Sequence, residues 1–200
     1  MIALVACSAT KLGHRAPARE LYQGDTFTLV RRILEHPASR VDDWAILSGA
    51  HGLVLPTDAL DPYDLYLGDL PTDERAAWHE RVLDQIARAW GTSQVYEIYA
   101  GAYYTNLQWY RTLPHMERVY ATWAREHSNS PSRTRFGIGH IRRRLAIRLA
   151  TLDAAAEVSP PLLADEVPTA PVLNPRTHRL GSQMAWLFEP TPRTPKDAQR

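Results

Sequence analysis

Three short apolar segments, each followed at once by small and polar residues, constrain most strongly what this chain can fold into. They are IALVA (Ile2–Ala6), WAILS (residues 44–48) and VYEIYA (residues 95–100). Apolar runs of this length are typical of strands that are buried on both faces of a parallel sheet. The segments between them carry apolar residues at helical spacing. The sequence therefore predicts a three-layer α/β fold, with a mainly parallel central sheet and helices on both faces.

The expected helices and the remaining strand follow from periodicity and from stop signals. Helices are predicted over residues 18–36 with a break at Gly24 and Asp25, over Thr72–Trp90, over residues 103–113 and over residues 139–152, and a fourth strand over residues 116–121. From residue 157 onward there are eight prolines in 44 residues. We therefore expect a domain over residues 1–155 and a Pro-rich tail over 156–200, with one short helix near residues 180–188, that either wraps around the domain or is disordered.

Composition excludes several classes of protein. No run approaches eighteen consecutive apolar residues, and the first apolar segment lacks a charged region before it, so neither a membrane span nor a secretory signal is expected. A single cysteine, Cys7, rules out an internal disulfide and fits a reducing compartment. The eight histidines show no metal-ligand spacing. We expect a cytoplasmic monomer that has no metal, no cofactor and no membrane contact.

Charge is distributed unevenly, although the net charge is only +1. Between Arg111 and Arg148 nine arginines stand against two acidic residues. This imbalance indicates a local anionic partner, and the alternative is an ordinary solvated helix face. Only two of the 23 cations are lysine, so Lys11, which lies in a turn, is a candidate for a required compact ammonium group.

The three strand exits are expected to converge, because ligands of open α/β sheets bind beyond the carboxyl ends of the strands. At the first exit, Cys7, Ser8 and Lys11 can hold an anion through hydroxyl, backbone N–H and ammonium groups. The spacing of a nucleotide P-loop is missing, which disfavours NTP hydrolysis. Cys7 is either a nucleophile or, as is more common for a cysteine that ends a strand, a small core residue.

The second exit, LSGAHGLVLPTDALDPYD, covers residues 47–64. Pro56 and Pro62 stiffen this loop, so that it can hold Tyr63 in place to stack on a nucleobase. A carboxylate from Asp61 or Asp64 can stabilise positive charge on a sugar or position a water molecule. Turn and cap chemistry is the alternative for both aspartates.

At the third exit, Asn106 is placed one turn into a helix, where its amide can read a base edge, unless it serves as a helix cap. Tyr103 and Tyr104 either close the pocket or belong to the core. A fourth feature is the glycine turn before the last helix. It comprises Arg133, Arg135, Gly137, Gly139 and the run Arg142, Arg143 and Arg144. Backbone N–H groups at such a turn, with arginines beside them, can bind DNA phosphates.

The strings LYQGDTF and ILSGAHGLVLPTDALDPYDLYLG, together with CSATK, resemble the YaaA family and, more widely, proteins with uracil-DNA-glycosylase architecture. The resemblance covers about residues 1–115. The shared positions are Lys11, Tyr22, Gly24, Ser48, Gly49, Gly52, Pro56, Asp58, Pro62 and Tyr63. Asp61 and Asp64 are not general to this pattern. Small relatives of the group resemble anti-phage DNA glycosylases that remove modified bases such as glucosylated hydroxymethylcytosine.

The resemblance implies a DNA glycosylase. Asp64, Asp61 and Lys11 are its candidate catalytic residues, and Arg133, Arg135 and the following glycines and arginines contact DNA. The substrate-binding candidates are Cys7, Ser8, Tyr22, Ser48, Gly49, His51, Tyr63, Tyr103, Tyr104 and Asn106. Two alternatives remain open: a DNA-binding stress protein without catalytic activity, and a hydrolase or transferase of free nucleosides or nucleotides.

Overall fold

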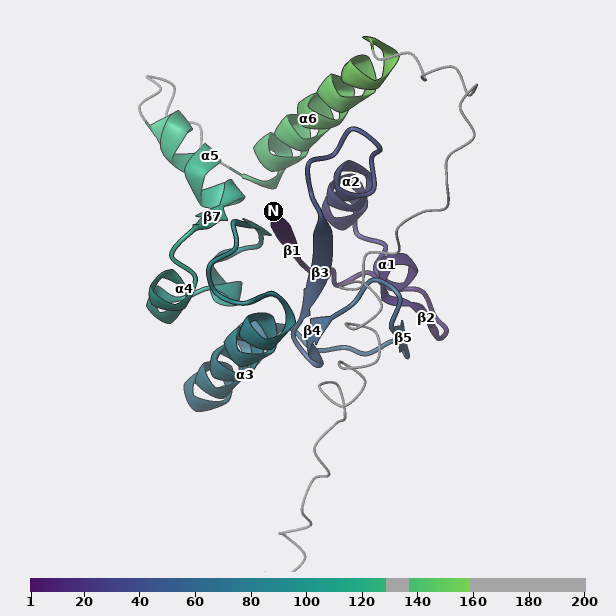
Figure 1. Cartoon of the computed structure of the whole chain (residues 1–200). Helices are drawn as coiled ribbons and strands as arrows, with labels where there is room; N and C mark the ends of the chain where they lie inside the picture. The colour runs from purple at the N-terminus through teal and green to yellow at the C-terminus, as the bar shows by residue number, and fades with distance from the viewer. Residues whose placement is uncertain (129–136, 159–200) are drawn as a thin grey trace, which may run out of the picture.

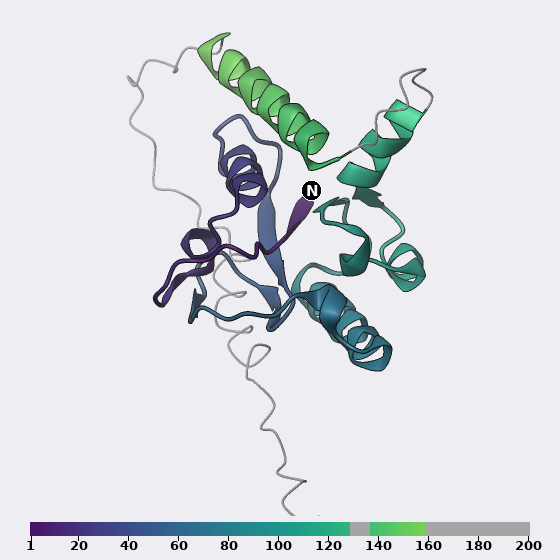
Figure 2. The ribbon, with the colours of Figure 1, turned by 180° about the vertical axis from the view of Figure 1, so that it is seen from behind.

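A computed structural model describes residues 1–128 and 137–158 of the chain. Its centre is a five-stranded sheet in the order β4-β3-β1-β6-β7 (Figures 1 and 2). The strands are β1 (Ile2–Ala6), β3 (Asp43–Ser48), β4 (Gly52–Val54), β6 (Tyr96–Tyr99) and β7 (Met116–Arg118). All pair in parallel except β4, which turns back antiparallel to β3. The predicted α/β class and the mainly parallel sheet are confirmed.

Helices cover both faces of the sheet. On one face lie α1 (Ala18–Leu21), α2 (Asp25–Leu34) and α6 (Ile138–Val158), and on the other lie α3 (Thr72–Trp90) and α4 (Leu107–Thr112) (Figure 1). Successive residues of β1 alternate between the two cores: Ala3 and Val5 face α2, whereas Ile2 and Leu4 face α3. The helix α5 (Val119–Ser128) adds Val119 to the first core. A second, two-stranded sheet joins β2 (Ala16–Pro17) to β5 (Ala59–Leu60).

Several expected boundaries move. The first predicted helix is broken at Gly24, as expected, into α1 and α2. The predicted helix over residues 103–113 becomes a 3₁₀ turn, η2 (Ala102–Tyr104), followed by α4. The fourth strand ends at Arg118, because α5 begins at Val119 and packs that valine into the core. The last helix runs past the expected domain end at residue 155 to Val158. The predicted helix near residues 180–188 lies outside the described residues.

The order of the strands creates a switch point between β1 and β6. The chain leaves β1, crosses through α1 and α2, and enters β3 on one side of β1; it later returns as β6 on the other side. Crossovers that leave in opposite directions open a crevice outside the carboxyl ends of the two central strands. The fold therefore places its natural ligand position beside Ala6 and Tyr99.

Candidate functional site

A cavity of about 250 Å³ lies at this switch point. Cys7 and Ser8 line it from the end of β1, and Gly101 lines it from the end of β6. Asp25 is contributed by the first turn of α2, and Arg142 by the first turns of α6. Two of the three predicted strand exits, the first and the third, therefore meet at one cavity. The second exit does not line it.

The wall at the start of α2 depends on a close approach between two segments. The backbone N–H of Gly24 donates to Ser8 Oγ at 3.1 Å, and this hydroxyl donates in turn to the carbonyl of Thr10 at 2.7 Å. A Cβ atom on residue 24 would lie 2.7 Å from the Cβ of Ser8, which is closer than packed atoms allow. Glycine at position 24 is thus required for the wall.

A carboxylate and a guanidinium form an ion pair at the cavity. Asp25 Oδ2 lies 3.1 Å from the guanidinium of Arg142, and Arg142 Nε donates to Thr26 Oγ1 at 3.4 Å. The aspartate also sits at the N-terminus of α2, where the helix dipole favours a carboxylate. Asp25 is a functional candidate that sequence reasoning missed. The signal that could have found it is the Gly-Asp-Thr string at the expected helix break.

Beside the cavity, the first two exits form a second group, the tyrosine cluster, comprising Lys11, Tyr22, Ser48, His51 and Tyr63. The hydroxyl of Tyr63 is hydrogen-bonded to Ser48 Oγ at 2.7 Å and to the hydroxyl of Tyr22 at 2.9 Å. Lys11 Nζ lies 4.2 Å from the centroid of the Tyr63 ring, within range of a cation–π contact, and the His51 ring packs edge-on at 5.0 Å. The structure thus brings together five residues that were predicted to share a site.

Burial keeps this cluster uncharged apart from Lys11. Desolvation raises the pKa of the Tyr22 hydroxyl to about 12, and it raises the pKa of Tyr63 further still, with the nearby Cys7 thiol adding to both shifts. Burial lowers the pKa of His51, which favours the neutral imidazole at pH 7. Tyr22 and Tyr63 therefore act as neutral hydroxyl donors. Because Lys11 covers one face of Tyr63, a base can stack on that face only if the lysine moves.

Cys7 connects the cavity to the tyrosines. It lines the cavity, and its sulfur lies 3.4 Å from the hydroxyl of Tyr104, which is itself buried. Burial and the adjacent thiol raise the pKa of Tyr104. The cysteine is half-buried at the end of β1. Tyr104 therefore belongs to the core, which was one of the two roles considered for it, and its hydroxyl reaches the thiol at the cavity.

The other predicted site residues lie elsewhere. Asp61 is exposed and pairs with Arg15 at 2.8 Å, and Asp64 is also exposed; neither lines the cavity. Asn106 is the N-cap of α4 rather than a residue one turn into the helix, and its Oδ1 accepts from Gln108 N at 3.0 Å. The capping alternative is confirmed. The 3₁₀ turn η2 ends at Tyr104 and α4 begins only at Leu107, which leaves Asn106 just before the helix. Gly49 packs beneath Leu65 and shapes the loop.

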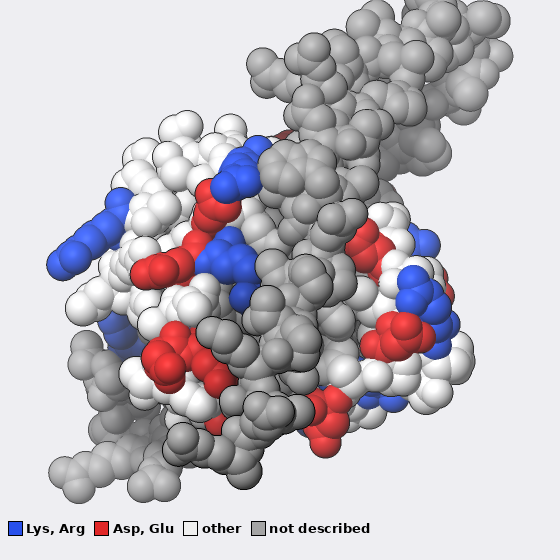
Figure 3. Space-filling view, turned by 90° about the horizontal axis from the view of Figure 1, so that it is seen from below, with Lys and Arg blue, Asp and Glu red and all other residues white. Residues whose placement is uncertain are grey.

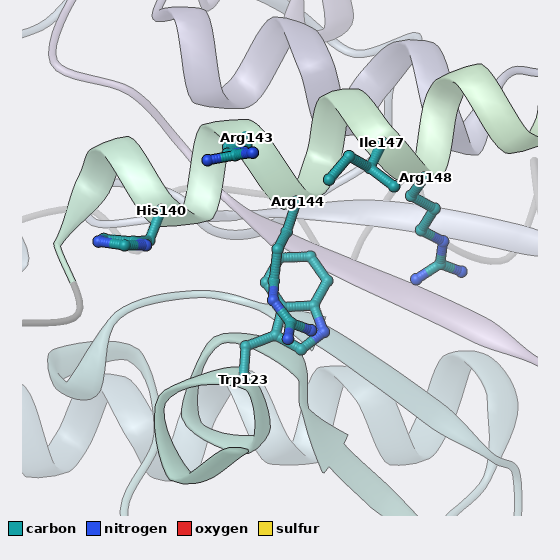
Figure 4. A pocket seen from close by; sticks show the side chains of 6 residues that line it. All are labelled: Trp123, His140, Arg143, Arg144, Ile147 and Arg148. Atoms are coloured by element: carbon teal, nitrogen blue, oxygen red, sulfur yellow. The ribbon is translucent and has the colours of Figure 1, made fainter. Parts of the chain in front are cut away.

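A groove of about 700 Å³ separates α5 from α6. Arg144 extends from α6 toward Trp123, with its guanidinium 5.5 Å from the indole, and Arg148 extends from the same helix (Figure 4). Arg144 pairs with Glu126 at 2.8 Å, and Arg148 pairs with Glu97 at 3.1 Å. Arg143 is exposed and has no ion pair within residues 1–128 and 137–158. The helix was expected to present free arginines, yet carboxylates neutralise most of them.

The glycine turn is described only from residue 137 onward. Gly137 is exposed, and its carbonyl accepts from the N–H groups of His140 and Ile141 at the first turn of α6. Gly139 lies within that turn, with open space around its α-carbon. Arg133 and Arg135 lie outside the described residues. On the face seen in Figure 3, acidic and basic side chains alternate over the visible described surface.

Residues 1–128 and 137–158 contain neither a metal-binding cluster nor a membrane-spanning helix. No three His, Cys, Asp or Glu side chains gather there in a way that could hold a metal ion. None of the helices in this part of the chain is both long and apolar enough to span a bilayer.

Comparison with known proteins places the chain in a family. The family model described as a family of unknown function, DUF6884, matches residues 2–124. The chain belongs to this DUF6884 family. No curated protein and no solved structure matches it. The matched span includes the cavity walls made by β1, α2 and β6, and the tyrosine cluster, whereas the arginine-bearing helix α6 lies beyond it.

Proposed function

We propose that this protein is a DNA glycosylase that hydrolyses the N-glycosidic bond of a modified base in DNA. The observation that carries the proposal is the adjacency of the cavity and the arginine-lined groove. Arg142 lines the cavity and the next residue, Arg143, lines the groove; Tyr99 lines the cavity and accepts a hydrogen bond from Arg148 of the groove. A base that enters the cavity would leave its phosphates beside the groove. A free nucleoside has no use for the groove.

The chemistry requires a carboxylate near the sugar. Water adds to C1′, the bond between C1′ and the base nitrogen breaks, and the departing base takes up a proton. Asp25 is the carboxylate at the cavity, and it stabilises positive charge on the sugar and orients the water. It takes the role that the sequence pattern assigned to Asp61 and Asp64. Ser8 and Cys7 contact the base, and Lys11 reaches the flanking phosphate or the departing base.

The proposed substrate follows from the resemblance to anti-phage glycosylases, which favours a phage-modified base such as glucosylated hydroxymethylcytosine and a role in antiviral defence. The test incubates the purified protein with phage DNAs that carry different modifications, and measures released bases by mass spectrometry. We expect one modified base to be released. Release from none of the DNAs would overturn the proposal and leave two candidates, a DNA-binding protein without catalytic activity and a hydrolase or transferase of free nucleosides or nucleotides.

Three matched variants identify the carboxylate. Asp25→Asn should reduce base release by at least 100-fold, since removing one stabilising group at a developing charge costs about that much. Asp61→Asn and Asp64→Asn alter aspartates that are exposed, as Asp25 is, but that lie outside the cavity, and they should retain release. DNA affinity is measured for each, so that lost binding is not mistaken for lost chemistry. Loss of release in Asp64→Asn alone would return the role to Asp64.

The neutralised arginines favour a second candidate, a hydrolase or transferase of free nucleosides or nucleotides. Arg142, Arg144 and Arg148 each pair with a carboxylate, which reduces their attraction for phosphates. A triple variant in which Arg142, Arg143 and Arg144 are all replaced by alanine distinguishes the two candidate functions. A glycosylase loses DNA affinity and shows a smaller salt slope, whereas turnover of a free nucleoside changes little.

A further inference from the structure

Two exposed tyrosines stand next to each other on short 3₁₀ turns. Tyr66 directly precedes η1 (Leu67–Asp69), and Tyr103 lies within η2. They are 51% and 49% exposed, and their rings meet edge to face with centroids 5.8 Å apart. Large aromatic side chains that remain half in water, although partners are close at hand, leave π-faces open to a ligand.

The pair is held in place from below. The guanidinium of Arg75 lies 5.6 Å from the centre of the Tyr103 ring, and its Nη1 donates to the carbonyls of Gly68 and Leu70. A Cβ atom on residue 68 would lie 2.4 Å from the Tyr66 ring, so the ring packs directly on the glycine backbone. The two rings are therefore positioned before any ligand arrives, which lowers the entropic cost of binding.

This pair lies beside the cavity at the switch point. Gly101, two residues before Tyr103, lines the cavity, and Tyr104, the next residue, contacts Cys7 of the cavity wall. Tyr66 is close enough to Tyr104 to contribute to its raised pKa. A ligand that fills the cavity and continues over the exposed Gly101 would thus meet the paired rings.

We propose that Tyr66 and Tyr103, braced by Arg75, form a stacking platform for the nucleobase next to the one that enters the cavity. The platform rests on the proposed function, and it makes single-stranded or locally opened DNA the form that is bound. A nucleobase fits this surface because its π-face can stack on one tyrosine ring while the other ring, which stands at 80° to the first, meets its edge. Paired bases in a duplex present no free face.

The test measures binding of single-stranded DNA by fluorescence anisotropy. One probe is a labelled oligonucleotide, and the other has the same length and phosphates but abasic sites in place of its bases. Tyr66→Ala and Tyr103→Ala should each weaken binding of the first probe by about 5- to 100-fold, as expected for the loss of one stacked base, and leave the second unchanged. Tyr103→Trp should retain affinity.

Tyr110→Ala is the matched control. Tyr110 lies on α4 and is 48% exposed, but no aromatic ring or guanidinium braces it among the described residues. Equal losses for Tyr110→Ala and Tyr103→Ala, equal losses on both probes, or no binding of single-stranded DNA by the wild-type protein would each overturn the platform. Base release is assayed separately. A platform that binds while no modified DNA releases a base would leave the platform standing and overturn the glycosylase.

Discussion

His79 should make this protein lose stability as the pH falls below the ordinary pKa of histidine. Its Nδ1 accepts a hydrogen bond from Trp109 Nε1 at 3.0 Å, inside the core between α3 and α4, where His79 is 5% exposed and Trp109 is fully buried. An accepting Nδ1 carries no proton. Burial and the nearby Arg75 both lower the pKa of His79 from its usual 6.5. The folded protein therefore holds the neutral ring.

The size and sign of the effect follow from proton linkage. Above pH 6.5 His79 is neutral in both states, and its full contribution to stability is present. Below pH 6.5 the unfolded chain binds the proton and the folded protein does not, so the free energy of unfolding falls, by at most about 1.4 kcal/mol per pH unit, down to the folded pKa. For a chain of this length, each 1 kcal/mol lowers the melting temperature by about 2–4 °C.

The assay is urea unfolding at a series of pH values between 7.5 and 5, followed by circular dichroism. His79→Asn keeps an acceptor for Trp109 but cannot be protonated, so its stability should fall less steeply than that of the wild type below pH 6.5. Burial also lowers the pKa of His51, which therefore supplies a slope of the same sign that both proteins keep. Exposed His115 is the control, since His115→Asn should run parallel to the wild type. Parallel curves for His79→Asn as well would refute the reasoning.

Two further predictions concern the site. Gly24→Ala forces a Cβ against Ser8, so it should lower the free energy of unfolding by about 1–3 kcal/mol and abolish base release. Gly139→Ala adds its Cβ to open space and should not destabilise the protein. Unfolding midpoints compare the two variants, and a Gly24→Ala protein as stable as the wild type would show that the wall can shift. Tyr63→Phe removes the partner of the buried Tyr22 hydroxyl and should lower the free energy of unfolding by about 1–3 kcal/mol. The double variant Tyr63→Phe, Tyr22→Phe should be little less stable than Tyr63→Phe alone. Additive losses in that double-mutant cycle would contradict a shared hydrogen bond.

The strands β1, β3 and β6 and their parallel direction could be predicted because each is a short apolar run that needs cover on both faces. The antiparallel strand β4 was not predicted, since Gly52–Val54 was expected to lie in a loop. The break at Gly24 was also visible, since glycine interrupts helices. The start of α5 was not visible. Val119 to Ala121 continue an apolar pattern that fits a strand or a helix equally well, and only packing of Val119 into the core decides between them. The expectation that Asn106 lies one turn into a helix was wrong for a related reason, because its position relative to α4 depends on the preceding 3₁₀ turn.

Most of the tyrosine cluster was predictable, whereas the ion pair at the cavity was not. Lys11, Ser48 and Tyr63 lie at two strand exits that a parallel sheet must bring together, so their convergence follows from topology. Tyr22, at the end of α1, was expected only from the family resemblance. The pairing of Asp25 with Arg142 joins residues 117 positions apart. It depends on how α6 packs along α2, and the apolar pattern of a helix states which face is buried but not against which neighbour.

The charge pairing of the arginine run was mispredicted for the same reason, because the sequence does not state which elements α6 packs against. Counting charges along α6 indicated an open cationic surface, but the helix lies where Asp25, Glu126 and Glu97 come from three other elements to meet it. Arg143 is the exception among the described arginines of this run, since it lines the groove and pairs with none of those carboxylates. If DNA follows the groove, Arg143→Ala should by itself reduce the salt slope of binding by about one, and Arg144→Ala, which also unpairs Glu126, should weaken binding with a smaller change in slope. An unchanged slope in Arg143→Ala would place the DNA elsewhere on the protein.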